Sequence, residues 1–240
     1  MSKQEVYKNL KFLHREKSDF QDIRVYDSDC LGRILVLDRV IQIGSKCFED
    51  DQYTKCMVNT VVRPSKPYGH VVIIGGGDLV IATHLLREYP LISKVTVCEI
   101  DSRVVEVTKK YFSFADIVEQ ELAKGRLEVV IESGAVYMDK LFLSGHSGKI
   151  GAFIIDCTDF ALDEDSLAAE LFTPEFYSQI YALLEQGGGF SQHISDMECK
   201  DEFTKRTREG GFVHALPFIE MAKTPEYGGE LPIANCFKPP

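Results

Sequence analysis

The sequence lacks the cysteine and histidine spacings that commonly hold metal ions. Its 7 cysteines and 6 histidines include no CxxC, HxxxH or HExxH pattern, so no metal site is expected. The cysteine count is odd, and several cysteines lie in apolar, strand-like contexts. This distribution favours reduced thiols in a cytoplasmic protein over a disulfide framework.

Long apolar runs and positive charge are also scarce. The first residues, MSKQEVYKNLKF, contain no apolar core of a signal peptide, and no run reaches about eighteen apolar residues. We therefore expect neither secretion nor a membrane span. Lys and Arg number 27 against 37 Asp and Glu, a net charge of −10. That balance argues against a nucleic acid or an anionic membrane as partner.

The stretch from Val71 to Tyr111 carries the strongest structural signal. An apolar run, 71–74, leads into a glycine turn, a helix-like segment follows, and a second apolar run ends on Glu99. This order is typical of a nucleotide-binding βαβ unit. Glycines let a ligand approach the backbone, and the acid after the second strand can accept hydrogen bonds from ribose hydroxyls. The turn consists of Gly75, Gly76, Gly77 and Asp78.

Residue patterns predict the remaining elements. Residues 1–65 are interpreted as a small β-rich domain, with a strand at 20–26, a hairpin of strands at 33–37 and 40–43, and a helix over 49–62. In residues 66–240 strands and helices alternate, which predicts a doubly wound, mostly parallel α/β sheet. The predicted strands lie at 70–75, 94–99, 127–131, 151–156 and 190–194, and the helices at 79–89, 102–112, 134–143, 173–185 and 198–208. Glycines 187–189 are expected to cap a helix, and the tail carries turn signals at Pro225, Gly228, Gly229 and Pro232.

Polar residues follow several of the predicted strands. Ligands of an open α/β sheet bind at the carboxyl ends of its strands, near the point where the strand order reverses. The residues expected there are 75–78, Glu99, Glu132, Ser133 and 156–159. An acidic crevice of this kind suits a ligand with positive charge, such as a sulfonium nucleoside or an amine.

With these residues in place, the chain resembles the polyamine aminopropyltransferases, the spermidine and spermine synthase family, over nearly its whole length. FQDIRVY at 20–26 and GRILVLDRVIQ at 32–42 resemble the family's first strand and hairpin. IIGGGD at 73–78, CEID at 98–101 and IIDCTDF at 154–160 resemble its IGGGDGG, EID and D-[ST]-[ST]-D-P blocks. The resemblance implies a Rossmann-like sheet of the class I methyltransferase type with a small N-terminal β-meander domain.

The family resemblance also implies an activity and the residues that carry it. Aminopropyltransferases move an aminopropyl group from decarboxylated S-adenosylmethionine to a diamine or triamine, release methylthioadenosine and use no prosthetic group. The attacking amine must lose a proton that it holds up to pH ~10, and a carboxylate can accept it. Asp156 matches this base. By the resemblance, the substrate-binding residues are Asp159, Asp78, Tyr53, Tyr227 and Gln192, and the donor-binding residues are Gln21, Gly75, Gly76, Gly77, Glu99, Glu132 and Ser133. A homodimer is implied because family members pair.

The match to the family breaks inside the donor turn. Leu79 and Val80 follow Asp78, where the family has two glycines. A bulky side chain in a tight contact costs roughly 1–3 kcal/mol, which is about a tenfold to hundredfold loss of donor affinity. Ser133 stands where the family tends to have an aspartate, and Phe160 replaces a proline.

The acceptor and the activity both stay open from the sequence. Thr54 after Tyr53 is closer to the spermine synthase pattern, whereas Asp159 is closer to the spermidine type. Three hypotheses follow. The first is an active aminopropyltransferase. The second is a catalytically weak or inactive homologue that acts as a structural or assembly subunit. The third, a lesser one, is an S-adenosylmethionine-dependent amine N-methyltransferase on the same scaffold.

Overall fold

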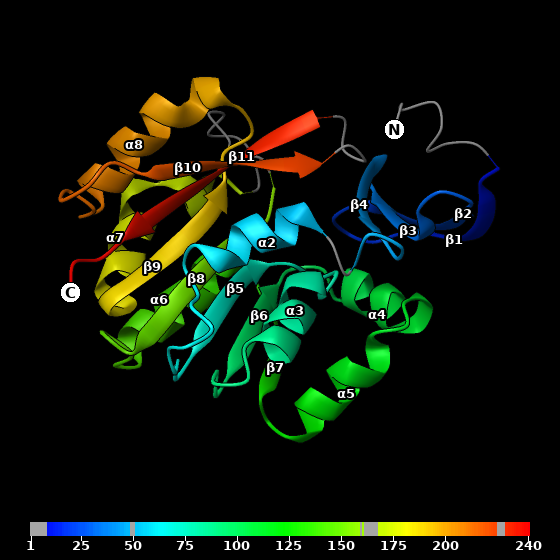
Figure 1. Ribbon diagram of the computed structural model, residues 1–240, viewed down its shortest axis with the longest axis horizontal. Coiled ribbons are helices and arrows are strands. Elements are labelled where there is room, and N and C mark those ends of the chain that lie inside the picture. The colour runs from blue at the N-terminus through cyan, green and yellow to red at the C-terminus, as the bar shows by residue number, and fades with distance from the viewer. Residues whose placement is uncertain (1–8, 49–50, 159, 161–167, 225–228) are drawn as a thin grey trace.

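The computed structural model describes residues 9–48, 51–158, 160, 168–224 and 229–240 (Figure 1). A small antiparallel sheet lies at one end of the molecule, and a larger seven-stranded sheet with helices on both faces makes up the rest. This arrangement confirms the predicted Rossmann-like fold with an N-terminal antiparallel sheet.

The small sheet has the strand order β1-β2-β3-β4. The predicted hairpin is confirmed: β3 and β4 are joined by Asp38 (φ 46°) and Arg39 (φ 72°). Two positive φ values in a two-residue turn match the right-handed twist of the strands on either side. The predicted strand at 20–26 is β2, which begins and ends two residues later. A further strand, β1, was not predicted. The bounds are β1 (Lys11–Lys17), β2 (Asp22–Ser28), β3 (Gly32–Leu37) and β4 (Val40–Gly44).

The large sheet has the strand order β10-β11-β9-β8-β5-β6-β7. From β9 to β7 all neighbours are parallel, whereas β11 runs antiparallel to both β9 and β10. The chain passes from β5 to β6 and β7 on one side and then crosses to β8 on the other, so the order reverses between β5 and β8. The bounds are β5 (Val71–Gly75), β6 (Val95–Glu99), β7 (Leu127–Ile131), β8 (Ile150–Asp156), β9 (Leu184–His193), β10 (Phe218–Thr224) and β11 (Gly229–Phe237).

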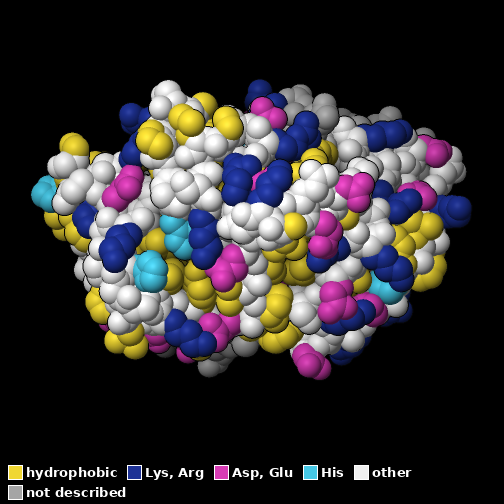
Figure 2. Space-filling view, turned by 90° about the horizontal axis from the view of Figure 1, so that it is seen from below, with side chains coloured by type: hydrophobic (Ala, Val, Ile, Leu, Met, Phe, Trp, Pro, Cys, Tyr) yellow, Lys and Arg dark blue, Asp and Glu magenta, His cyan; other side chains and the backbone are white. Residues whose placement is uncertain are grey.

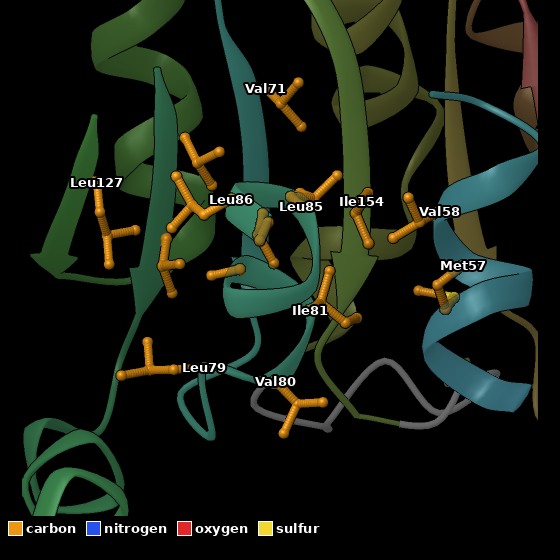
Figure 3. Close-up of a cluster of buried hydrophobic side chains, with 14 of the residues drawn as sticks. Met57, Val58, Val71, Leu79, Val80, Ile81, Leu85, Leu86, Leu127 and Ile154 are labelled. Carbon is orange, nitrogen blue, oxygen red and sulfur yellow. The ribbon is translucent and has the colours of Figure 1, made fainter. Parts of the chain in front are cut away.

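Helices cover both faces because the central strands are apolar on both sides. Val71 and Ile73 pack with α2, α3, α4 and α5, while Val72 and Ile74 pack with α6, α7 and α8. Figure 3 shows part of the first cluster, around α3. The bounds are α2 (Gln52–Asn59), α3 (Val80–Glu88), α4 (Ser102–Tyr111), α5 (Ala115–Ala123), α6 (Gly134–Leu143), α7 (Pro174–Leu183) and α8 (Lys200–Glu209), with short 3-10 turns η2 (Ala169–Phe172) and η3 (Met197–Cys199).

Helix α2 lies between the two sheets in the chain but packs on the large one. It contacts β10 and α3, and the hydroxyl of Ser191 on β9 donates a hydrogen bond to the carbonyl of Met57 (2.5 Å). The predicted domain boundary near residue 65, between units 1–65 and 66–240, stays a prediction.

One sequence prediction is wrong in the C-terminal half. Glycines 187–189 do not cap α7; they lie inside β9. A Cβ on Gly188 would lie 2.9 Å from the carbonyl oxygen of Gly151, and one on Gly189 would lie 2.7 Å from the ring of Phe237. Close packing of strands therefore requires these glycines. The tail also contains two strands that were not predicted, β10 and β11, which form an antiparallel pair.

The surface carries charges of both signs. On the face shown in Figure 2, lysine and arginine side chains are interspersed with acidic ones, and neither sign forms a continuous patch. No helix within the described ranges is both long and apolar enough to cross a membrane.

Candidate active site

The reversal point between β5 and β8 brings the glycine turn against the predicted base. Gly75 pairs in register with Asp156, and the N–H of Gly76 donates to the carbonyl of Asp156 (2.9 Å). Gly75 has φ 84°, and a Cβ there would lie 2.0 Å from the carbonyl oxygen of Asp156. Glycine is needed because any side chain would push the two strand ends apart.

The carboxylate of Asp156 is half-buried and accepts a hydrogen bond from Tyr53. The distance from the Tyr53 hydroxyl to Oδ1 is 2.7 Å, although the two residues are 103 positions apart. Burial raises the pKa of Asp156 above the usual carboxylate range, more than the Tyr53 bond lowers it. A carboxylate with a raised pKa is a stronger base than an ordinary aspartate.

Asp78 lies beside Asp156 at the start of α3. Its Oδ1 accepts a hydrogen bond from the N–H of Val80 (3.0 Å), which stabilises the N-terminus of α3. Burial raises the pKa of Asp78, and the negative charge of Asp156 raises it further. A buried carboxylate next to a second negative charge forms a site for a positively charged group.

Glu99, at the end of β6, is held by the backbone on both sides. Its Oε2 accepts the N–H of Gly77 (3.0 Å), and its Oε1 accepts the N–H of Asp101 (2.9 Å). A Cβ on Gly77 would lie 2.7 Å from Glu99 Cγ, so this glycine allows the contact. Burial still raises the pKa of Glu99 above its ordinary value.

Gln21 reaches this region through Asp101, a buried residue that the sequence analysis did not single out as a ligand. The Gln21 amide and the Ser18 hydroxyl both donate to Asp101 Oδ2, at 3.0 Å and 2.6 Å. Asp101 Oδ1 accepts the N–H of Arg103 at the start of α4. The small sheet is thus fixed to the large one beside Glu99.

The remaining predicted residues have different surroundings. The carboxylate of Glu132 pairs with Lys140. Ser133 is the N-cap of α6, but its side chain makes no capping bond. Gln192 is 1% exposed; its Oε1 accepts from the Tyr177 hydroxyl (3.0 Å), and its Nε2 has no hydrogen-bond partner among the described residues. Asp159 and Tyr227 lie outside the described residues.

The side chain of Leu79 is buried in the core, whereas the sequence analysis expected it to crowd the donor turn. Its side chain is 0% exposed and belongs to the apolar cluster around α3 (Figure 3). The backbone at Leu79 is left-handed, φ 62° and ψ 11°, a conformation that glycine adopts far more easily. The core accommodates the side chain, and the cost of having leucine instead of glycine at this position is strain in the left-handed backbone.

Comparison with known proteins places this geometry in a family. Residues 50–233 match the spermine/spermidine synthase domain, and residues 6–44 match the spermidine synthase tetramerisation domain. The chain belongs to the spermine/spermidine synthase family.

Curated relatives agree with this assignment. A polyamine aminopropyltransferase of Clostridium tetani is 31% identical over 229 residues, which cover 92% of this chain and 74% of the relative. Spermidine synthase 1 of Pisum sativum is 32% identical over 180 residues, which cover 74% of this chain and 49% of the relative. The chain thus spans three quarters of one relative and about half of the other.

Solved structures of spermidine synthases share the fold. The enzyme from Thermotoga maritima superimposes with a TM-score of 0.75 at 24% identity, covering 95% of this chain and 73% of that one. A spermidine synthase in complex with the transition state analogue AdoDATO gives a TM-score of 0.77 at 25% identity, covering 95% and 74%.

Proposed function

We propose that this member of the spermine/spermidine synthase family transfers an aminopropyl group from decarboxylated S-adenosylmethionine to a diamine or triamine. The observation that carries the proposal is Asp156, a half-buried carboxylate with a raised pKa, at the point where the strand order reverses. Tyr53 holds one of its oxygens at 2.7 Å, so the other oxygen is left to face a substrate.

The proposed chemistry is a single displacement. The lone pair of the acceptor amine attacks the methylene next to the sulfonium, the new C–N bond forms, and the C–S bond electrons return to sulfur. Methylthioadenosine leaves as a neutral thioether, and the proton of the amine passes to Asp156. Holding the two reactants in line supplies much of the remaining rate enhancement.

The other residues are proposed to bind the two substrates. Asp78 faces the aminopropyl nitrogen of the donor, because its raised pKa marks a place where a cation is stabilised. Glu99 binds the ribose, and its two backbone bonds fix its orientation. The rest of the donor is assigned to Gln21, Gly75, Gly76, Gly77, Glu132 and Ser133, and the acceptor to Tyr53, Asp159, Gln192 and Tyr227.

The inactive-homologue hypothesis depended on Leu79, Val80 and Ser133. The side chain of Leu79 packs in the apolar cluster around α3, so its bulk is not exposed at the donor turn. The methyltransferase hypothesis is disfavoured by the family match, since both curated relatives are named for aminopropyl transfer or spermidine synthesis. Aminopropyl transfer is therefore the function we propose.

Self-association is proposed on separate grounds. Residues 6–44 match a tetramerisation domain, and the small sheet exposes Phe12 and Val40, at 58% and 54%. Exposed apolar side chains on one sheet favour burial against another copy. We propose a homodimer as the smallest assembly, which light scattering of the eluting protein would measure.

The function is tested by binding and by turnover. We expect calorimetric titration with methylthioadenosine to show micromolar binding that Glu99→Ala abolishes. We expect Asp156→Asn to lower transfer to diamines by about 10²-fold or more, with an unchanged circular dichroism spectrum. A folded wild-type protein that fails to bind methylthioadenosine at millimolar concentration would contradict the proposal.

A further inference from the structure

Asp101 is a buried carboxylate that no motif of the sequence assigned to a ligand. It is 1% exposed and is the N-cap of α4. Its Oδ1 accepts the N–H of Arg103 (3.0 Å), while its Oδ2 accepts the Gln21 amide (3.0 Å) and the Ser18 hydroxyl (2.6 Å). The side chain of Asp101 is thus an acceptor in each of these three bonds, two of which come from the segment that leads into β2.

The turn before β2 directs its donors to Asp101. The Ser18 hydroxyl oxygen accepts the N–H of Phe20 (3.1 Å) and the N–H of Gln21 (3.0 Å). Its oxygen is therefore occupied as an acceptor, and its single proton goes to the short bond with Asp101. The turn and the carboxylate together fix the place where the side chain of Gln21 begins.

The carboxylate also fixes which end of the Gln21 amide points away from it. The oxygen and the NH2 group of a glutamine have nearly the same shape, so their partners decide the orientation. Because an ionised carboxylate only accepts hydrogen bonds, Asp101 holds the NH2 group and turns Oε1 away. Within the described ranges no residue donates to this Oε1, and it is not among the buried polar atoms that lack a partner. It is an acceptor open to solvent.

The backbone of Asp101 orients a second acceptor. Its N–H donates to Oε1 of Glu99 (2.9 Å), so a single residue holds one acceptor from each sheet, Gln21 from the small one and Glu99 from the large one. A ribose carries two neighbouring hydroxyl groups with one proton each. Two acceptors held by the same residue suit such a pair of hydroxyls.

The small sheet stays attached without the side chain of Asp101, because other bonds join it to α4. Arg103 pairs with Glu16 through two contacts, Nε to Oε1 (2.6 Å) and Nη2 to Oε2 (2.9 Å). Arg33 on β3 donates to the carbonyl of Tyr111 at the end of α4 (2.8 Å). Changing the side chain of Asp101 therefore affects the Gln21 amide first and the docking of the sheet second.

We propose that Asp101 is a positioning residue for the donor. It turns the amide of Gln21 so that Oε1 accepts one ribose hydroxyl while Glu99 accepts the other. The inference rests on the proposed function, in which Gln21 and Glu99 bind the donor, and adds the residue that orients both of them.

The test uses two variants that keep a cap for α4. Asp101→Asn retains an oxygen for the N–H of Arg103, and Asp101→Ser caps about as well but is too short to reach Gln21. The asparagine presents an NH2 group to the Gln21 amide, which must turn its oxygen inwards. Calorimetric titration with methylthioadenosine is expected to give a Kd about tenfold higher in both variants. Glu16→Gln is the control, because it weakens the surface pair with Arg103 and leaves Gln21 untouched; its Kd should stay within twofold of the wild type.

Two further measurements distinguish positioning from a general structural role. If Asp101 acts through Gln21, the double variant Asp101→Asn, Gln21→Ala binds methylthioadenosine within twofold of Gln21→Ala alone, whereas independent effects would multiply to about hundredfold. In the wild type, the 2′-deoxy and 3′-deoxy analogues should each bind about tenfold more weakly than methylthioadenosine. In Asp101→Asn, one of the two analogues, the one without the hydroxyl that Gln21 accepts, should bind as well as methylthioadenosine.

Other results would overturn the inference. An unchanged Kd in folded Asp101→Asn, beside a wild type that binds methylthioadenosine, would refute the inference and leave the proposed function intact. Equal weakening of all three nucleosides, or a hundredfold loss in the double variant, would show that Asp101 does not act through the Gln21 amide. A wild type that binds no methylthioadenosine would refute the proposed function and the inference together.

Discussion

Leu79 offers a test of backbone strain at the turn into α3. The residue has a left-handed backbone (φ 62°), and its side chain is 0% exposed. Two variants separate these features: Leu79→Ala and Leu79→Gly. Both lose the buried side chain, at a cost of about 2–5 kcal/mol for a leucine cut back to alanine. Only the alanine variant keeps the left-handed penalty, about 1–2 kcal/mol for a residue with a Cβ.

The glycine variant is therefore expected to be more stable than the alanine variant by about 1 kcal/mol, after allowance for the larger backbone entropy of unfolded glycine. In a regular helix the order is the reverse, with glycine about 1 kcal/mol less stable than alanine. Urea unfolding followed by circular dichroism gives both free energies of unfolding. An alanine variant that equals or exceeds the glycine variant would refute the argument from strain.

The same two variants test whether Leu79 restricts the donor. Because the side chain packs in the core, we expect the affinity for methylthioadenosine to stay within about threefold of the wild type in Leu79→Gly. A tenfold gain in affinity would show that the leucine narrows the donor site, as the sequence alone suggested.

Three further predictions concern the ionisable and polar groups of the site. Tyr53→Phe removes a hydrogen bond that lowers the pKa of Asp156, so the acid limb of the pH profile of kcat/KM should move to higher pH. An unchanged acid limb would show that Tyr53 does not influence the ionisation of the base. The pKa of Asp78 is raised on folding, so its contribution to stability is full below pH ~4 and is lost as pH rises through the folded pKa. Asp78→Asn should therefore stabilise the ligand-free protein at pH 8 but not at pH 4, as urea titrations at the two pH values would show. Tyr177→Phe leaves the buried Oε1 of Gln192 without its hydrogen-bond donor, which should lower the free energy of unfolding by about 1–3 kcal/mol. A loss below about 0.5 kcal/mol in urea unfolding would contradict this prediction.

The local sequence was sufficient to predict those elements whose structural signals lie within their own residues. The apolar run into β5, the glycine turn and the run ending on Glu99 give strand, turn and strand because each is encoded within about ten residues. The hairpin of β3 and β4 follows from its two-residue turn in the same way. These are the parts that the sequence predicted.

Elements that depend on distant partners escaped the sequence analysis. Strand β1 lies at an edge of the small sheet and is rich in charged residues. It is a strand because it pairs with β2. Helix α5 starts without a side-chain cap, so no start signal marks it. Strand β11 joins the large sheet by pairing with β9, and β10 joins it by pairing with β11, so neither strand is specified by its own segment alone.

The family resemblance, the central alternation of strands and helices from β5 to β8 and the acids that follow these strands were all predictable, because each is a property of a short segment. Only the tertiary structure decided which groups meet. Tyr53 and Asp156, 103 residues apart, form a side-chain hydrogen bond, and so do Gln21 and Asp101, 80 residues apart. The side chain of Leu79 is buried in the core. Such contacts depend on how distant segments pack against one another, and no pattern within a single segment specifies them.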